Sequence, residues 1–181
     1  MDYKILIAII AIIIIVVIFI YNRLVRLKLR CKNAWASIDN QLKRRADLIP
    51  NLVSVTKGYA QYESTTLVEV VNKRNNANNI EDLAKNDKEV SSALTKLLAL
   101  TEGYPDLKAN EIYKKLQVEL TGTEDKIAYA RQFYNDSVQF YNTAIMTFPS
   151  NLFAKLMNYK ELEYFKIKEE EKEVVKISLW Y

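Results

Sequence analysis

One stretch of this sequence places acidic and basic side chains close enough together to be considered for acid–base chemistry. The 181 residues contain no histidine, and Cys31 is the only cysteine. Ser–His and Cys–His nucleophile pairs are therefore excluded, as are metal sites built on histidine or on several thiolates. The glycine-rich loops that cradle phosphates are also absent from the sequence. The remaining candidates are Glu119, Glu124, Asp125, Lys126 and Arg131.

Acidic and basic side chains spaced so closely along a helix usually form ion pairs on a solvated face rather than an acid–base site. We therefore predict that the protein is not an enzyme, and that it has no catalytic residues, no metal site and no cofactor. Three of the twelve tyrosines, Tyr113, Tyr134 and Tyr141, fall on apolar helical stripes. We interpret them as core residues that hydrogen-bond between helices. Cys31 occupies a heptad core position and is interpreted as a small buried hydrophobe.

A second group of residues could act through charge alone. Residues 22–50 hold eight basic and two acidic side chains, a net charge of +6 in a chain whose overall charge is +4. The basic side chains that come first are Arg23, Arg26, Lys28, Arg30 and Lys32. Each Lys or Arg near an anionic membrane contributes about 1 kcal/mol of attraction, so we predict that these five contact lipid headgroups. The alternative, that they only fix topology, stays open. They lack the interleaved exposed aromatics typical of nucleic-acid binding, so no nucleic-acid partner is predicted.

The element that would position these charges is an N-terminal membrane anchor. Every residue from 5 to 20 is apolar, and Tyr3 and Tyr21 bracket the run. As a helix, residues 3–21 would be about 28 Å long, close to the hydrocarbon thickness of a bilayer. The run is too long for a signal peptide and no small-residue cleavage site follows it, so we predict a retained anchor. The basic excess predicts a plasma-membrane protein with its N-terminus outside and all residues from Arg23 onward in the cytoplasm.

The anchor is expected to continue into a long amphipathic helix, because apolar residues recur at three- and four-residue steps. This stripe comprises Leu24, Leu27, Cys31, Ala34, Ile38, Leu42, Leu48, Leu52, Val55, Tyr59 and Tyr62. Arg45 falls on the stripe, as either a register-fixing residue or a snorkelling side chain. Pro50 removes one helical hydrogen bond, yet the apolar phase continues through it. We therefore predict a kinked continuous helix rather than a turn.

Two further helices and a tail follow from the same patterns. A polar run at residues 75–79 predicts a loop, and residues 80–98 predict a second helix that stops at residues 102–106. A third helix is predicted over residues 109–147, with Gly122 as a weak spot inside it. Residues 151–159 predict a short helix capped by Ser150. The Lys- and Glu-rich residues 160–181 are expected to form a mobile tail, or to dock on the bundle or the membrane.

Long apolar stripes must pack against one another, which predicts the architecture. The predicted fold is all-α, an N-terminal transmembrane helix continuing into an antiparallel three- to four-helix bundle with long coiled-coil-like helices. Residues 1–21 form the anchor, residues 22–159 the bundle and residues 160–181 the charged tail. Because the second helix is shorter than the first, part of the first stripe is expected to stay exposed for a partner.

Several segments, in one order, resemble the LemA family of bacterial membrane proteins. They are residues 35–53 (WASIDNQLKRRADLIPNLV), 57–60 (KGYA), 103–110 (GYPDLKAN), 116–120 (LQVEL), 123–127 (TEDKI), 130–135 (ARQFYN), 148–151 (FPSN) and 163–165 (EYF). The resemblance runs from Tyr21 to about Phe165, with Gly122, Asp125 and the tail as local departures. It implies a single membrane span and a cytoplasmic helical bundle, with no catalytic residues to carry over.

These observations lead to two function hypotheses. The first is a non-catalytic, membrane-anchored scaffold or adaptor that presents a cytoplasmic bundle to a protein partner, or to a second copy of itself. The resemblance associates this role with a cell-envelope or membrane-associated process. The alternative is direct binding or shaping of anionic membrane by the juxtamembrane basic helix. Membrane lipid is a partner in both hypotheses, and neither involves a small-molecule substrate.

Overall fold

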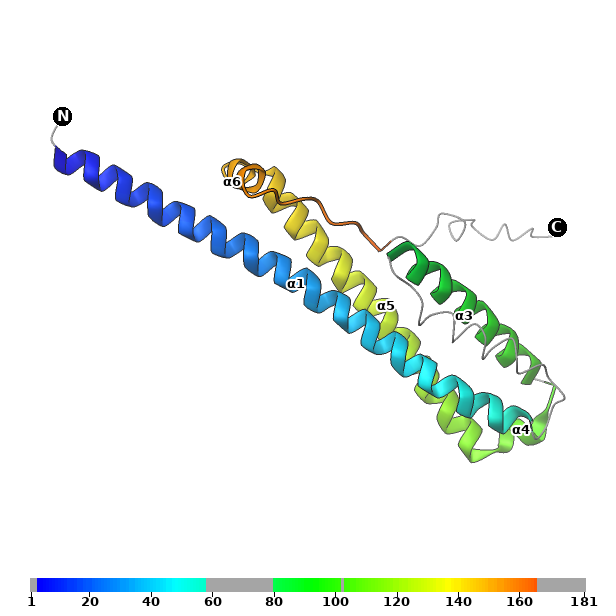
Figure 1. Cartoon of the computed structure of the whole chain (residues 1–181). Helices are drawn as coiled ribbons and strands as arrows, with labels where there is room; N and C mark the ends of the chain where they lie inside the picture. Colours follow the sequence, from blue (N-terminus) through cyan, green and yellow to red (C-terminus); the bar gives the residue numbers. More distant parts are fainter. Residues whose placement is uncertain (1–2, 58–79, 102, 166–181) are drawn as a thin grey trace, which may run out of the picture.

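The structure is a computed structural model that describes residues 3–57, 80–101 and 103–165. Across these ranges the chain is helical, with no strand, and its long helices pack side by side (Figure 1). The all-α prediction and the helical bundle are confirmed. The predicted loop at residues 75–79, the stripe positions Tyr59 and Tyr62, and the tail beyond Phe165 lie outside the described residues.

Helix α1, Tyr3–Lys57, carries the candidate membrane span and the first helix of the bundle as one continuous element. Its N-terminal segment has a mean hydropathy of 3.3 over 18 residues, and this is the helix in the described chain that is long and apolar enough to cross a membrane. The helix passes through Pro50 without ending, as predicted. Pro50 itself is exposed, whereas Ile49 and Leu52 beside it are buried. The buried neighbours hold the helix against the bundle on either side of the missing hydrogen bond.

Helix α5, Glu111–Met146, is the main partner of α1 and runs antiparallel to it. The pairs Trp35–Tyr134 and Arg45–Glu124 show the direction, because the residue number on α5 falls as the number on α1 rises. The Asn110 side chain starts α5 by accepting hydrogen bonds from the backbone N–H groups of Ile112, at 2.9 Å, and Tyr113, at 3.1 Å. This is a normal N-cap, and it matches the predicted start of the third helix.

Helix α3, Ile80–Thr101, packs on the half of the bundle that is distant from the span. Its buried residues Val90, Leu94 and Leu97 join Ile49 and Leu52 of α1 in the distal cluster. A short helix, α4 (Pro105–Ala109), which the sequence did not predict, then leads into α5. Only Leu83 and Ala84 at the start of α3 reach the proximal core, so another element must cover the rest of the proximal half of the α1–α5 seam.

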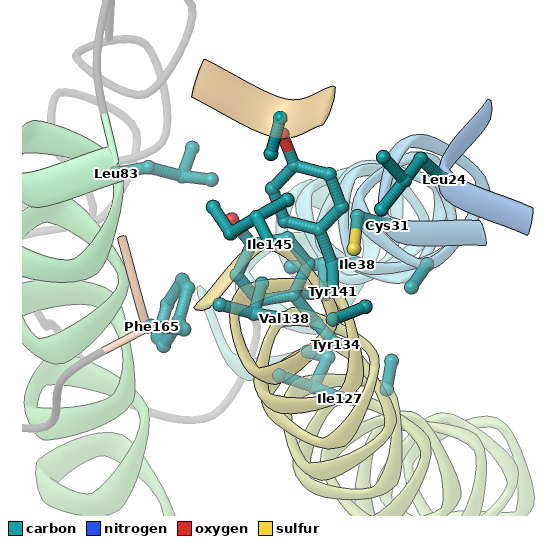
Figure 2. Packing of buried hydrophobic residues seen from close by; sticks show 14 of the residues in the cluster. Leu24, Cys31, Ile38, Leu83, Ile127, Tyr134, Val138, Tyr141, Ile145 and Phe165 are labelled. Atoms are coloured by element: carbon teal, nitrogen blue, oxygen red, sulfur yellow. The ribbon is translucent and has the colours of Figure 1, made fainter. Parts of the chain in front are cut away.

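The proximal core lies between α1 and α5 near the span (Figure 2). It includes Leu24, Cys31 and Ile38 from α1, and Val138 and Tyr141 from α5 (Figure 2). The core position of Cys31 agrees with the prediction of a small buried hydrophobe.

Helix α6, Ser150–Leu156, turns back at the end of α5. Ser150 is not its N-cap as we predicted, because the helix already includes Ser150 and no side-chain cap bond is present. The Ser150 hydroxyl instead donates to the carbonyl oxygens of Ala144, at 2.6 Å, and Thr147, at 3.0 Å, at the end of α5. α6 ends where Asn158 takes a φ of 54°. The following N–H of Tyr159 bonds to the Ala154 carbonyl at 2.9 Å, as in a Schellman cap.

Residues 158–165 form an extended segment, here called the strap, that runs from α6 toward the start of α3 (Figure 1). Its Tyr159, Leu162 and Phe165 side chains belong to the proximal core. The strap therefore covers the part of the seam that α3 does not reach. Our expectation that part of the α1 stripe stays exposed is wrong for the described residues, since its members from Leu24 to Val55 are buried or half-buried. The reason is that a non-helical segment replaces the missing helix.

Candidate functional site

Arg45 lies at the centre of a buried ion cluster, not at the surface. Arg45 is only 1% exposed. Its Nη2 lies 2.5 Å from Asp87 Oδ1 of α3, and its Nη1 donates to Glu124 Oε1 of α5 and to Ser91 Oγ of α3, both at 3.0 Å. The snorkelling alternative is therefore excluded, and the register alternative remains.

Arg131 of α5 completes this cluster by contacting the other carboxylate oxygen of Asp87. Two guanidinium and two carboxylate groups from three helices thus alternate and neutralise one another. Leaving the buried charge of Arg45 or Asp87 without a partner is costly, so Asp87 can meet both arginines at only one axial position of α3. Arg131 also stacks on the Phe165 ring at 5.1 Å, which joins the cluster to the strap. We infer that the cluster sets the register of α3 on the α1–α5 pair.

The remaining predicted carboxylates do not join the cluster. Glu119 lies 4.0 Å from Arg44 of α1 with both side chains about half exposed, so it forms a solvated ion pair between helices and not with a neighbour on its own helix. Asp125 and Lys126 are exposed on α5. The five candidate residues at positions 119–131 therefore have two kinds of environment. Glu124 and Arg131 turn inward, whereas Glu119, Asp125 and Lys126 face solvent. No group of three or more Cys, Asp or Glu side chains that could hold a metal ion is found among the described residues.

The five predicted headgroup contacts all lie exposed on α1, directly after the candidate span. They are Arg23, Arg26, Lys28, Arg30 and Lys32. The helical rise separates them by height, because Arg23 and Arg26 lie about 3–8 Å beyond Tyr21 along the axis. Lys28, Arg30 and Lys32 lie about 10–16 Å beyond Tyr21, past the headgroup layer of a bilayer.

Two of the higher basic side chains also have contacts within the bundle. Lys28 Nζ lies 5.2 Å from the centroid of the Tyr159 ring in the strap. The Arg30 guanidinium lies 5.2 Å from the Phe133 ring and 5.6 Å from the Phe140 ring of α5. Such cation–π contacts flank the α1–α5 seam on both sides and favour a packing role for these two residues.

The strap is held on α5 by two asparagine side chains that sequence analysis missed. Asn142 Nδ2 donates to the Leu162 carbonyl at 2.9 Å, and its Oδ1 accepts from the Leu162 N–H at 2.9 Å. Asn135 makes the same pair of bonds with Phe165, at 3.1 and 2.8 Å. Each carboxamide thus replaces the backbone of a neighbouring strand, which satisfies the polar groups of an extended segment without a sheet.

Two of the predicted core tyrosines complete the attachment of the strap. Tyr134 Oη donates to the Glu163 carbonyl and Tyr141 Oη to the Lys160 carbonyl, both at 3.0 Å. Burial raises the pKa of both phenols, so they stay protonated and able to donate. Burial likewise raises the pKa of the Cys31 thiol, although the nearby charge of Arg30 opposes this. Tyr134 and Tyr141 are confirmed as buried core residues, but their hydroxyl groups bond to the strap and not to another helix as we predicted. Tyr113 is buried, and its hydroxyl lies 2.7 Å from the Thr101 hydroxyl of α3, which is the predicted contact between helices.

Comparison with known proteins decides the family. The model of the LemA family matches residues 34–179. The chain belongs to the LemA family. Together with the apolar segment of α1, this shows a membrane-associated protein.

Three relatives extend the comparison. Magnetosome protein MamQ of Magnetospirillum gryphiswaldense is 26% identical over 174 residues, covering 80% of this chain and 64% of the relative. Magnetosome protein MamQ 1 of Paramagnetospirillum magneticum is 26% identical over 177 residues, covering 82% and 65%. Protein LemA of Metamycoplasma hominis is 27% identical over 155 residues, covering 83% of this chain and 71% of the relative. This LemA-family chain thus spans just under two thirds of the length of the MamQ relatives.

Proposed function

We propose that this LemA-family protein is a non-catalytic, membrane-anchored scaffold that presents its bundle to a protein partner or to a second copy of itself. The observation that carries the proposal is a row of exposed apolar side chains on α5: Val118, Tyr129 and Phe140. They are spaced eleven residues apart, which is three helical turns, so they share one face of the helix. Such a row is not needed to close the core, because other residues of α5 pack against α1, α3 and the strap, and only Phe140 of the row also lies next to a side chain of α1, that of Arg30.

The rigid form of α1 supports the same proposal. The helix runs without a break from the candidate span to the distal cluster, so the exposed row is held at fixed heights above the membrane. A scaffold needs this kind of fixed presentation more than it needs reactive groups. The buried ion cluster adds to it by holding α3 in one register.

Photocrosslinking in intact membranes tests the proposal. A benzophenone amino acid at Tyr129 should give reproducible crosslinks to one protein or to a second copy. The same residue at Lys96, which is exposed on α3, is the matched control and should give none. If Tyr129 crosslinks no more than Lys96 and the protein is monomeric in the membrane, the scaffold proposal is wrong.

The alternative, direct binding of anionic lipid, rests on the height of Arg23 and Arg26 within the headgroup layer. Native mass spectrometry from nanodiscs of mixed phosphatidylcholine and phosphatidylglycerol would measure which lipids stay bound. Replacing Arg23 and Arg26 by Gln should reduce the retained phosphatidylglycerol. Replacing Lys28 and Lys32 by Gln is the matched control and should change it little. Equal retention in all three proteins would contradict direct lipid binding by these residues.

The proposed location of the bundle is the cytoplasm, with the N-terminus outside, because the basic residues follow the candidate span and hardly any precede it. Its test is labelling of whole cells with a membrane-impermeant maleimide. The reporter should be Gln139→Cys in a Cys31→Ala background, because Gln139 is exposed. Ser150 is buried and would make a poor reporter. Labelling before lysis would place the bundle outside and overturn the assignment.

A further inference from the structure

The end of the bundle that carries α6 exposes several large apolar side chains within residues 146–157. Phe148 in the turn before α6 is 79% exposed, and Leu156 at its end is 84% exposed. Met146, Leu152 and Met157 are exposed beside them. We call these five residues the tip surface. The opposite face of α6 is packed, because Ala154 is buried and Phe153 lies against the proximal core.

The height of this tip surface is fixed by what α6 packs against. Ile20 and Leu24 of α1 belong to the same core cluster as Ala154 and Phe153. Ile20 is the last residue of the apolar run in the candidate span, and Tyr21 follows it. α6 contacts α1 and lies at the end of the bundle nearest the N-terminus (Figure 1), which places it beside the point where α1 would leave the hydrocarbon layer. The apolar run of the span therefore ends near the level of α6.

The composition of α6 fits a membrane interface. Its sequence, SNLFAKL, contains no acidic residue, and its one charge is the exposed Lys155 in the last turn. Lys160 follows in the strap, and Arg23 lies on α1 just above the end of the span. Apolar side chains flanked by basic ones are the pattern of helices that lie in the plane of a membrane, with the apolar face among the lipid chains. A surface that binds a protein partner would have no reason to lie at the end of the membrane span, whereas a surface that enters the membrane must lie there.

We propose that α6 and the turn before it insert the tip surface into the interfacial layer of the membrane that α1 spans. The bundle then has two contacts with the bilayer, the span and α6. This inference goes beyond the scaffold role and concerns other side chains than the proposed headgroup contacts on α1. It depends on α1 crossing the membrane, and the experiment below separates that assumption from the proposal.

The test measures the contact between single positions and lipid in the full-length protein. The chain carries Cys31→Ala and one reporter cysteine labelled with a nitrobenzoxadiazole fluorophore, and it is reconstituted in phosphatidylcholine–phosphatidylglycerol vesicles that contain doxyl-labelled lipid. The reporters are Leu156→Cys on the tip surface, Val118→Cys on α5 and Ile12→Cys in the span. Val118 is the matched control, because it is 72% exposed and apolar but lies at the other end of α5.

We expect quenching at Leu156 to exceed that at Val118 by at least about threefold, since an interfacial helix buries its apolar face roughly 5–10 Å into the membrane. Ile12 should be quenched most strongly by lipid labelled deep in the acyl chains. Quenching at Ile12 but not at Leu156 overturns the proposal while leaving the span intact. Quenching at neither position overturns the span, and the proposal with it. Crosslinking of an unquenched Leu156 position to a protein would assign the tip surface to a partner instead.

A second variant tests whether the quenching depends on the apolar face of α6 or on the attached fluorophore. Leu152→Glu is placed in the chain that carries Phe148→Cys as the reporter. Both side chains are exposed, so the core does not depend on them. The added charge should reduce lipid quenching at position 148 by at least about half, because a carboxylate opposes insertion of the apolar face. Unchanged quenching would show that this face of α6 does not enter the membrane.

Discussion

Removing the charge of Asp87 should loosen α3 from the bundle while the α1–α5 pair stays folded. In Asp87→Asn the side chain keeps its shape but no longer neutralises Arg45 and Arg131, which then face each other with Glu124 as the remaining carboxylate of the cluster. Asp87 is 6% exposed. Removing one partner of a buried ion pair costs roughly 3–5 kcal/mol, and the retained amide oxygen places Asp87→Asn at the lower end, about 3 kcal/mol.

The matched control is Glu124→Gln in the same cluster. The Glu124 side chain is 37% exposed, so water already solvates part of its charge. Its pairing with Arg45 is therefore expected to contribute no more than about 1 kcal/mol. The structure thus predicts a difference of about 2 kcal/mol between two substitutions that each remove one negative charge from the same Arg45.

The measurement is urea unfolding of the full-length protein in detergent micelles, followed by Trp35 fluorescence in a Trp180→Phe background. Trp35 reports on the core because its ring packs 5.3 Å from Tyr134 and 6.3 Å from Phe165. Amide hydrogen exchange should show α3 opening before α1 and α5 in Asp87→Asn. If Asp87→Asn costs no more than Glu124→Gln, or if exchange rises equally in all helices, the cluster does not set the register of α3.

Three further predictions use the same assay. Pro50→Ala should be tolerated or should stabilise the protein by up to about 1 kcal/mol, since α1 already passes through this position and regains a hydrogen bond; a loss of helical circular dichroism would contradict this. Asn142→Ala should cost about 1–3 kcal/mol and speed proteolysis of the strap, because both of its bonds to Leu162 are lost; unchanged proteolysis would refute the attachment. The phenols of Tyr134 and Tyr141 have raised pKa values in the folded state, so their contribution to stability is complete below their ordinary value of 10.0 and falls as the pH rises above it. Replacing both by Phe should remove this alkaline slope, and a slope that persists would assign it to other groups.

Features carried by local periodicity could be predicted from the sequence. The apolar steps of three and four predicted α1 and α5, and the unbroken phase across Pro50 correctly favoured one helix over two. The predicted start of the third helix at residue 109 lies close to that of α5, where the Asn110 side chain caps two backbone N–H groups of the first turn. These are contacts between residues within a few turns of each other, which a pattern in one segment records directly.

Features that depend on long-range pairing could not be predicted. Arg45 stood out on the stripe, but its partner Asp87 lies 42 residues away and is unremarkable within its own helix. The strap could not be predicted for a related reason. It has no repeating pattern, and its backbone hydrogen bonds are made with Asn135 and Asn142 of another element. A useful signal was the pair of asparagines seven residues apart on the buried side of α5, where a polar side chain needs a partner.

The continuity of α1 gives the molecule a mechanical property. About 54 Å of unbroken helix separate Tyr21 from Lys57, and the distal cluster is attached to the far end of this rod. A span that tilts by ~10° to match a thinner bilayer would carry that end sideways by roughly 9 Å if the helix moves as one body, and the packing of Ile49 and Leu52 on either side of Pro50 favours such movement. Bilayer thickness would thereby become a lateral displacement of the distal surface, amplified by the length of a single helix.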